Sequence, residues 1–323
     1  MKKPILALMA LAALTLGANV ALAAFPEKPI TLVVPFPPGG SSDTIARTIS
    51  VEMQKRLGQS VIVDNRGGAS GTIGATLVKR AAPDGYTLLV SSLAPFVVAP
   101  HLLKGLQYDP RTDFDLLTVA VQAPNVLVVP LNSPMKSLDD VLKRLKAEPG
   151  KMSFATSGAG SSDHLTAELF WQQTGTQGLH VPYKGGGPVM TDLLGGQVDA
   201  SFQNINAVIP QVQGEKIRAL AITSAKRSPL LPNVPTLAEA GIKGIDAVYS
   251  WQAVAAPKGI PADARQKLHA AIVAALNEPS VRQKLLDLGF EIVANTPEQF
   301  VKYQADEYAR WKNVIEVGKI SAE

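Results

Sequence analysis

The amino-acid sequence predicts an α/β protein with two lobes, each built on a mainly parallel sheet that is flanked by helices. Short β-branched segments alternate with amphipathic helical segments along the chain, which is typical of parallel sheets covered by helices on both faces. About 300 residues remain after a leader segment, more than one ordinary hydrophobic core holds. Two segments, near 119–126 and near 249–253, are suited to cross from one lobe to the other.

The first lobe is predicted to begin with strands and helices in alternation. The segment 42–57 is expected to be a helix because Ile45, Ile49, Met53 and Leu57 recur every four residues on one face. The strands and helices of this set are expected, in order, at residues 30–34, 42–57, 61–63, 72–80 and 86–90.

A second alternating set follows Pro124 and predicts the other lobe. Its strands and helices are expected at residues 126–129, 137–146, 152–155, 162–173, 180–182, 188–194, 198–202 and 217–223. A strand at 247–255 is expected to return to the first lobe, and helices are expected at 262–276, 280–288 and 297–317. The predicted division is residues 24–122 with 250–323 for lobe 1 and residues 123–249 for lobe 2, with a ligand cleft between them.

The first 24 residues predict export. Lys2 and Lys3 precede an apolar run at 5–16, and Ala21-Leu22-Ala23 supplies a cleavage pattern, so residues 1–23 have the parts of a secretory signal peptide. The alternative is an uncleaved N-terminal anchor, although the apolar run is shorter than the ~18 residues that a membrane-spanning helix needs. The mature protein is expected to start near Ala24 and to work outside the cytoplasm, away from ATP, NAD and nucleic acid.

Composition excludes several kinds of chemistry. The chain has no cysteine, which excludes disulfides, thiol catalysis and thiolate metal sites. Lys and Arg number 31 against 27 Asp and Glu, and without Lys2 and Lys3 the counts are 29 and 27, a net charge of +2. No basic block marks a surface for nucleic acid. We expect no nucleic-acid partner, no cofactor and a monomer.

Three glycine-rich turns, each between a predicted strand and a predicted helix, are the main candidates for a binding site. They are the segments 35–43, 156–162 and 183–188. Each places small residues before a helix N-terminus, where unpaired backbone N–H groups and the positive end of the helix dipole favour an anion. The alternative is that these are only turn and capping residues, with Asp43 and Ser162 as caps.

No sequence motif for catalysis or metal binding is present. The chain lacks the G-x-S-x-G, H-E-x-x-H and P-loop patterns. Its four histidines have no metal-ligand spacing with one another; they are His101, His164, His180 and His269. We therefore expect no catalytic residue and no metal site.

His164 is the histidine best placed to act in a binding site. It lies in the first turn of the helix after the second glycine-rich turn, so its ring is a candidate contact for a bound carboxylate; the alternative is a histidine packed near Glu168. A rival hypothesis is an exported hydrolase or lyase that uses His164 with Asp163 or Ser162. Phe36 and Trp251 are candidate apolar walls of a cleft. For Trp251 the alternative is plain packing between the lobes.

The chain resembles the periplasmic receptors of tripartite tricarboxylate transporters, also called Bug receptors, over essentially the whole mature sequence. The resemblance rests on many blocks in the right order. They include Phe25-Pro26-Glu27-Lys28-Pro29-Ile30, Val34-Pro35-Phe36-Pro37-Pro38-Gly39-Gly40, Pro83-Asp84-Gly85-Tyr86-Thr87-Leu88-Leu89, His164-Leu165, His180-Val181-Pro182-Tyr183-Lys184-Gly185, Gly195-Gly196-Gln197-Val198-Asp199 and Leu231-Pro232-Asn233-Val234-Pro235-Thr236.

The resemblance implies a two-lobe periplasmic binding protein of type II, the Venus-flytrap fold, that holds a small carboxylate between its lobes. On one side it implies contacts from Phe36, Pro37, Pro38, Gly39 and Gly40, together with Ser41 and Asp43 at the start of the next helix. On the other side it implies contacts from Tyr183, Lys184, Gly185 and Pro188. The far end of the ligand is expected to meet Ser91, Ser92, Ser157, Ser161, His164, Asp199 and Asn204.

The resemblance further implies a non-enzymatic solute receptor in the periplasm. Dicarboxylates, tricarboxylates, amino acids and aromatic acids all fit such a carboxylate clamp. The expected partners are the small carboxylate and the membrane subunits of a transporter. The alternative to transport is a ligand-sensing partner of a membrane sensor kinase.

Overall fold

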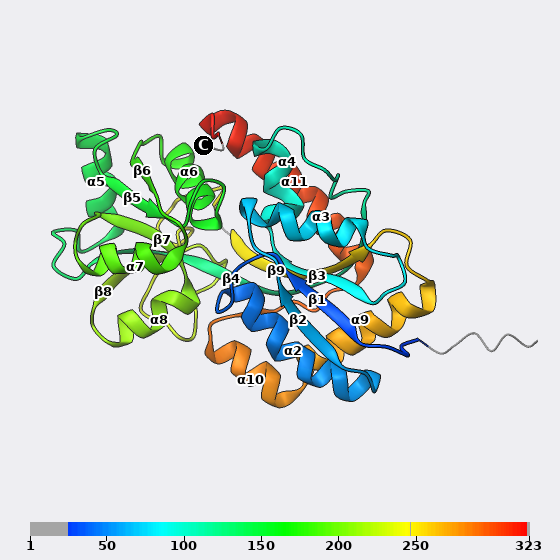
Figure 1. Cartoon of the computed structure of the whole chain (residues 1–323). Coiled ribbons are helices and arrows are strands. Elements are labelled where there is room, and N and C mark those ends of the chain that lie inside the picture. Colours follow the sequence, from blue (N-terminus) through cyan, green and yellow to red (C-terminus); the bar gives the residue numbers. More distant parts are fainter. Residues whose placement is uncertain (1–24, 246, 322–323) are drawn as a thin grey trace, which may run out of the picture.

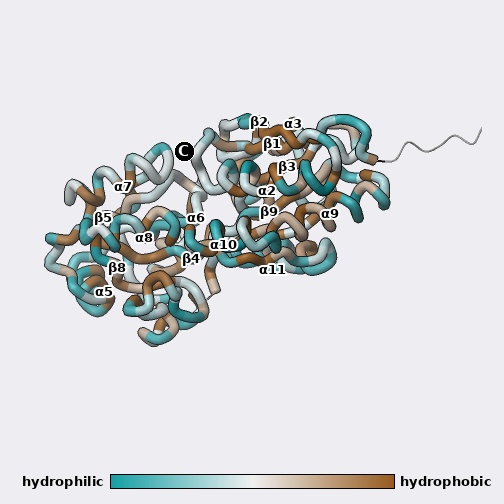
Figure 2. The backbone as a smooth tube through the Cα atoms, turned by 90° about the horizontal axis from the view of Figure 1, so that it is seen from below, coloured by the Kyte–Doolittle hydropathy of each residue, from teal (hydrophilic) through white to brown (hydrophobic). Residues whose placement is uncertain are grey.

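The computed structural model describes residues 25–245 and 247–321, which form two lobes side by side (Figure 1). The predicted signal peptide, residues 1–23, lies outside the described residues. Hydrophobic residues concentrate in the strands at the centre of the lobes, and hydrophilic residues follow many of the outer loops (Figure 2). Across 25–245 and 247–321, no helix has both the length and the apolar character that crossing a membrane requires.

Lobe 1 is built on a mixed sheet with the strand order β2-β1-β3-β9-β4, to which β10 adds at β4. β1 pairs in parallel with β2 and β3, whereas β9 runs antiparallel to β3 and β4. The bounds are Ile30–Val34 for β1, Val61–Asn65 for β2, Thr87–Ser92 for β3, Phe114–Pro130 for β4, Tyr249–Pro257 for β9 and Glu291–Ile292 for β10.

Helices cover both faces of the lobe 1 sheet (Figure 1). Apolar side chains of α2, α9 and α10 form one core with one face of the strands, and those of α3, η2 and α11 belong to the core on the other face. The short helices η1 and α4 adjoin α3 and η2. The bounds are Ser41–Leu57 for α2, Ala69–Gly71 for η1, Thr72–Arg80 for α3, Ala94–Val98 for η2, Ala99–Leu102 for α4, Ala262–Asn277 for α9, Pro279–Asp287 for α10 and Pro297–Gly318 for α11.

Lobe 2 repeats this plan with the second half of β4. Its order is β6-β5-β7-β4, with β8 paired to the other side of β4, and β5, β6 and β7 are parallel while β4 is antiparallel to β7 and β8. Apolar residues of α5 and α6 pack on one face and those of α7 and α8 on the other. The bounds are Leu138–Ala147 for α5, Ser153–Thr156 for β5, Ser162–Thr174 for α6, Leu179–Pro182 for β6, Gly186–Leu194 for α7, Ala200–Asn204 for β7, Ile205–Gln213 for α8 and Ile217–Ile222 for β8.

The strands β4 and β9 carry the chain between the lobes, and their register makes the carboxyl ends of the two sheets face each other. Ser92, the last residue of β3, is level with Gln252 of β9, which pairs with Val121 of β4. Asn204, the last residue of β7, pairs with Asn125 of β4. The two levels are four residue steps apart along β4, about 13 Å at ~3.3 Å per residue. We propose that the lobe boundaries fall here, at 122–123 and 249–250.

The structure differs from the sequence-based expectation in several elements and in the direction of some strands; the short elements η1, η2, α4 and β10 were also not predicted. β4 is one strand of 17 residues, where the sequence indicated a crossing segment followed by a short strand. The helix α8 was not predicted, because Pro210 stands inside it and proline normally ends a helix. The sheets are mixed rather than mainly parallel, because β4 and β9 run against their parallel neighbours.

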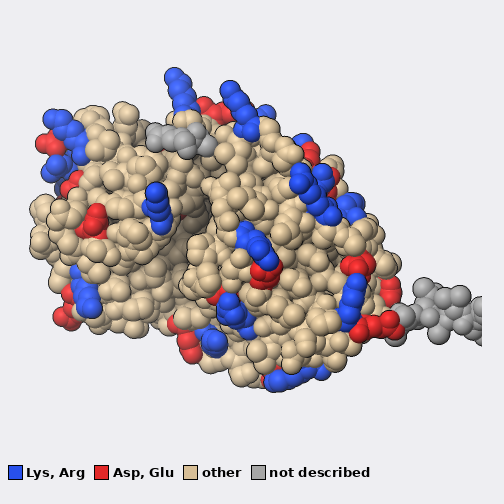
Figure 3. All heavy atoms as spheres, in the orientation of Figure 1, with Lys and Arg blue, Asp and Glu red and all other residues tan. Residues whose placement is uncertain are grey.

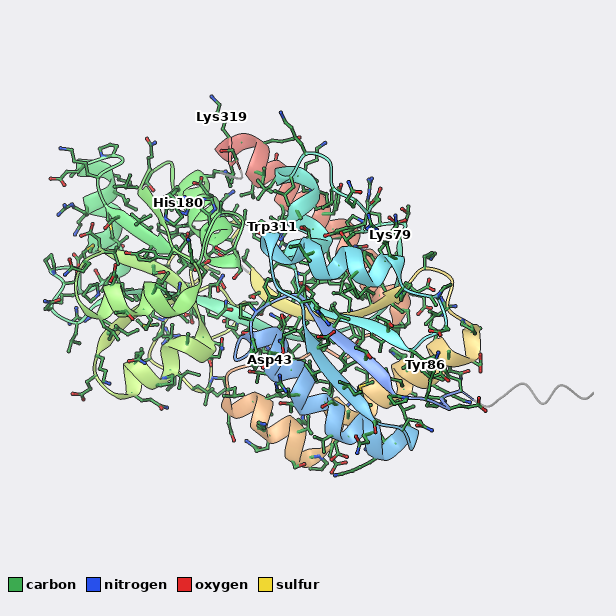
Figure 4. The ribbon with its side chains drawn as sticks, in the orientation of Figure 1. Asp43, Lys79, Tyr86, His180, Trp311 and Lys319 are labelled. Atoms are coloured by element: carbon green, nitrogen blue, oxygen red, sulfur yellow. The ribbon has the colours of Figure 1, made fainter. Side chains whose placement is uncertain are left out.

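Trp251 packs between β9 and the C-terminal helix rather than forming a cleft wall. The side chain is fully buried, its ring stacks 5.8 Å from the ring of Phe96, and its Nε1–H donates to Glu307 of α11 at 3.1 Å. Trp311, labelled on α11 in Figure 4, donates to the same carboxylate at 3.0 Å. Trp251 therefore packs within lobe 1, so it is neither a cleft wall nor a contact between the lobes.

Candidate functional site

A hollow opens between the two lobes in the space-filling view (Figure 3). The carboxyl ends of the parallel strands of both sheets point toward the level between Val121 and Asn125. In open α/β sheets, ligands bind at the carboxyl ends of strands. The segments that follow β1, β5 and β6 leave these ends, and they are the three glycine-rich turns that the sequence singled out; we call them the first loop (35–40), the second loop (157–161) and the third loop (183–185).

The conformation of the first loop is fixed by the carboxylate of Asp43, which lies in the helix that follows the loop. The side chain of Phe36 is half-buried and residues 37–40 are exposed. Gly39 has a φ of +88°, and its N–H donates to Asp43 Oδ2 at 2.9 Å. Arg47 Nε donates to both oxygens of Asp43 at 3.0 Å, and Asn65 Nδ2 bridges Asp43 Oδ1 and the Phe36 carbonyl at 3.0 and 3.1 Å. The loop is thus ordered by the protein itself.

Asp43 keeps its charge in this setting. Burial of the carboxyl raises its pKa, but the hydrogen bonds from Arg47, Gly39 and Asn65 together outweigh burial, and the pKa is lower than usual. Figure 4 places Asp43 at the end of α2 that is nearer lobe 2. Its negative charge is matched by Arg47, so it acts as a support of the loop rather than as a free anion beside the cleft.

The second loop is organised in the same way by Asp163, the second residue of α6. Asp163 Oδ2 accepts hydrogen bonds from the N–H and Oγ of Ser157 at 2.8 and 2.7 Å and from Gln203 Nε2 at 2.8 Å. Asp163 is 3% exposed. Ser161 Oγ donates to the Gly158 carbonyl at 2.6 Å, which closes the loop on itself.

The third loop packs directly on the second. Tyr183 N–H donates to the Thr156 carbonyl at 2.8 Å and Gly185 N–H donates to the Ser157 carbonyl at 3.1 Å. The Tyr183 hydroxyl donates to Asp192 at 2.6 Å. Lys184 and Pro188 are exposed. The second and third loops therefore form one rigid unit of lobe 2, opposite the first loop of lobe 1.

The helices that follow these loops begin without a side-chain cap. The capping residue has no side-chain hydrogen bond at α2, α6 or α7, whereas Ser137 and Thr296 cap α5 and α11 with complete capping boxes. Uncapped N–H groups remain able to bind an anion. The helices α9 and α10 are also uncapped, so the convergence of the three loops, not a bare helix end, defines the site.

Polar side chains of the crossing strands bond to polar side chains of α2, α6 and β7 at the level between the two sheets, and we call this group of five side chains the floor. Ser42 Oγ donates to Gln252 Oε1 at 2.6 Å. Asn125 Nδ2 donates to Thr166 Oγ1 at 2.8 Å, and its Oδ1 accepts from Asn204 Nδ2. Sequence reasoning named Asn204 but missed the other four; an available signal was that Asn125 and Gln252 interrupt runs of apolar strand residues.

The two predicted serines of β3 differ in their surroundings. Ser92 ends the strand and is level with Gln252 of the floor. Ser91 is fully buried, and its hydroxyl has no hydrogen-bond partner within the described part of the chain. Only Ser92 is brought next to the floor residues by the register.

Asp199 does not lie at the site, so the expectation that it meets the ligand is wrong. It directly precedes β7, at the amino end of that strand, and accepts from the N–H and Oγ of Ser153 at 2.8 Å. Ser153 begins β5, so both residues lie at the sheet edge opposite the loops. The carboxylate is used to join the starts of two parallel strands.

His164 lies inside lobe 2 rather than on the exposed loops. It is 3% exposed, its ring stacks 3.7 Å from the ring of His180, and its Nε2 lies 3.6 Å from Glu168 Oε1. This matches the alternative of a packed histidine near Glu168.

The arrangement gives no support to a hydrolase. His164 Nδ1 already accepts a hydrogen bond from Gly160 N–H at 3.1 Å. The Asp163 carboxylate already accepts hydrogen bonds from Ser157 and Gln203. No serine–histidine–carboxylate relay is present in the part of the chain that the structure describes. In those same residues, no three His, Asp or Glu side chains are grouped to hold a metal ion.

We expect the stability of the protein to fall in acid through His180. Burial, and second the charge of neighbouring His164, lower the pKa of His180 from 6.5 to about 4. Below about pH 6.5 the unfolded chain binds a proton that the folded chain does not, so the free energy of unfolding falls from about pH 6.5 toward pH 4 and is fully retained above that range. Denaturant unfolding across this range measures it. His180→Gln should lessen the slope; an unchanged slope would contradict the assignment.

Two α/β lobes joined by two crossing strands, with facing glycine loops at their carboxyl ends, define a bilobal solute-binding protein. The model for the tripartite tricarboxylate transporter family receptor matches residues 45–320, so the chain belongs to that receptor family, a family of binding proteins rather than enzymes.

Solved structures agree in fold over nearly the whole chain. A protein described as a periplasmic transporter is 41% identical, with a TM-score of 0.84 over 93% of this chain and 100% of its own. R. palustris Rpa4515 with adipate is 35% identical, with a TM-score of 0.85 over 93% and 100%. MatC of Rhodopseudomonas palustris with bound malate is 35% identical, with a TM-score of 0.81 over 90% and 100%.

Proposed function

We propose that this protein is a periplasmic receptor that binds a small carboxylate between its lobes and presents it to the membrane subunits of a tripartite tricarboxylate transporter. The observation that carries the proposal is that glycine loops of both lobes, each followed by an uncapped helix, leave strand ends that face each other across the crossing strands. The relatives that hold adipate and malate support a dicarboxylate as the ligand class. Export to the periplasm is supported by the leader sequence and by the periplasmic relative.

The proposed contacts come from both lobes and, apart from Lys184, carry no charge. From lobe 1 they are Phe36, Pro37, Pro38, Gly39, Gly40, Ser41 and Ser92, and from lobe 2 they are Ser157, Ser161, Tyr183, Lys184, Gly185, Pro188 and Asn204. One helix N-terminus favours an anion by roughly 0.3–2 kcal/mol. Several such ends, together with hydrogen bonds and burial of the ligand chain, supply the ~8 kcal/mol of a micromolar site.

A thermal-shift screen tests the ligand class. The protein without residues 1–23, refolded to remove ligand carried from the host, is mixed with malate, adipate, tricarboxylates, amino acids and aromatic acids. A ligand at about 100 times its Kd adds about 2.7 kcal/mol to the free energy of unfolding of the protein. The melting temperature of the protein then rises by several degrees. We expect the dicarboxylates to give the largest shifts. A flat response over the whole panel would count against a carboxylate receptor.

A further inference from the structure

Two histidines of lobe 2 lie face to face beside the second loop. The rings of His164, on α6, and His180, on β6, have centroids 3.7 Å apart and planes inclined by only 5°. Figure 4 shows His180 within lobe 2. Neither ring is among the proposed ligand contacts, so their arrangement calls for another role.

Each ring reaches the second loop by a hydrogen bond. His164 Nδ1 accepts from Gly160 N–H at 3.1 Å. His180 Nε2 lies 2.6 Å from Thr156 Oγ1, and that same hydroxyl oxygen accepts from Gly158 N–H at 3.4 Å. Gly158 and Gly160 both have positive φ values, +123° and +74°. The histidine pair therefore supports the two glycines that set the course of the loop.

Protonation reverses the role of the ring nitrogen that holds Gly160. A neutral imidazole accepts through one nitrogen, whereas the imidazolium ion carries a proton on both. A charged His164 would therefore direct a donor at the N–H of Gly160, and that hydrogen bond would be lost. Two stacked rings also oppose a second charge: burial and His164 together lower the pKa of His180 to about 4.

The charged groups around the pair are few. On α6, Glu168 Oε1 lies 3.6 Å from His164 Nε2, and Asp163 turns instead to Ser157 and Gln203. The neighbouring strand β5 presents uncharged Phe154 and Thr156 to His180. On the lobe 1 side, Gly318 of α11 lies beside Glu168, and Val98 and Leu102 lie beside Gly160.

We propose that His164 and His180 are positioning residues that hold the second loop in its binding geometry while both rings are neutral and release it when a proton enters the pair. The proposal rests on the proposed function only in that the loop binds the ligand; release of the loop is a property of the ligand-free protein. Ligand affinity then falls in acid for a reason separate from ionisation of the ligand.

Calorimetry on the wild type and on His164→Asn tests the effect on binding. The amide oxygen of Asn takes the place of Nδ1 as an acceptor for Gly160 but cannot be protonated. With malate and adipate as probes, we expect the wild type to lose about tenfold in affinity between about pH 7.5 and pH 5, the cost of one hydrogen bond. We expect His164→Asn to lose markedly less. Ionisation of the ligand is common to both proteins and cancels in the comparison.

His269 provides a matched control. It lies on α9 of lobe 1, where Nε2 contacts the Asn295 carbonyl at 3.1 Å, so His269→Asn should keep the wild-type pH profile. The proposal is overturned if His164→Asn loses affinity in acid as steeply as the wild type does.

Nuclear magnetic resonance of the ligand-free protein separates this inference from the proposed function. We expect the amide resonance of Gly160 to move between about pH 7.5 and pH 5 in the wild type, and this movement to vanish in His164→Asn. If neither malate nor adipate binds any variant, the proposed function is at fault and this titration still decides the histidine proposal. A Gly160 amide resonance that stays unchanged across this pH range in the wild type would overturn it.

Discussion

Replacing Asp163 by alanine is expected to lower the free energy of unfolding by about 2–4 kcal/mol and to weaken carboxylate binding at least tenfold, because buried donors lose their shared acceptor. The Asp163 carboxylate accepts from Ser157 N–H, Ser157 Oγ and Gln203 Nε2 within 2.8 Å. Without it the second loop has no fixed course, and the third loop, which bonds to the Thr156 and Ser157 carbonyls, loses its support. Denaturant unfolding and calorimetry with malate measure the two effects.

Asp199→Ala is the matched control for this variant. Asp199 also accepts a backbone N–H and a serine hydroxyl, both from Ser153 at 2.8 Å, but at the sheet edge away from the loops. It should lower stability and leave affinity unchanged. Equal losses of affinity in Asp163→Ala and Asp199→Ala would show that binding follows general stability and not the second loop.

Replacing Gly39 by valine is expected to reduce carboxylate affinity by about 100-fold or more, or about 2.7 kcal/mol, with a far smaller loss of stability. The position has a φ of +88°, and no atom lies within 4 Å of the point that a Cβ would occupy. The folded protein therefore has room for the side chain, at a cost of about 1–2 kcal/mol of backbone strain. The valine would instead cover the exposed backbone of residues 37–40, which the ligand must approach closely.

Gly150→Val separates backbone strain from loss of the site. Gly150 has a φ of +72°, and a Cβ there would also have no atom within 4 Å; the residue lies in the loop between α5 and β5. Both variants therefore carry a similar strain, and only Gly39→Val should lose affinity in calorimetry. An unchanged affinity in Gly39→Val would remove the first loop from the binding site.

Local sequence patterns predicted most of the fold because the relevant periodicities are short. The helices α2, α3 and α6 begin within one residue of their predicted starts, since apolar spacing and a preceding glycine turn are local signals. The long strand β4 was not predicted as one element, because Gln122, Pro124 and Asn125 interrupt its apolar run. Those residues are tolerated because they lie where the strand passes between the two sheets.

The positions of the glycine loops could be predicted from the sequence, but their supports could not. Asp43 accepts a hydrogen bond from Asn65, 22 residues further along the chain, and Asp163 accepts one from Gln203, 40 residues further along. No local sequence pattern predicts such distant partners. The stacking of His164 on His180 is of the same kind. Asp199 was misplaced although a signal existed: it precedes its strand, and ligands in such sheets gather at the strand ends that follow.

The central claim, that a small carboxylate is clamped between the first loop and the joined second and third loops, is tested most directly by a crystal structure with the dicarboxylate that gives the largest thermal shift. We expect one carboxylate of the ligand within hydrogen-bond distance of backbone N–H groups of both lobes, at the first loop and at the third loop. A ligand bound to one lobe alone, or in the shallow groove of α3 lined by Ile73, Leu77 and Arg80, would contradict the account.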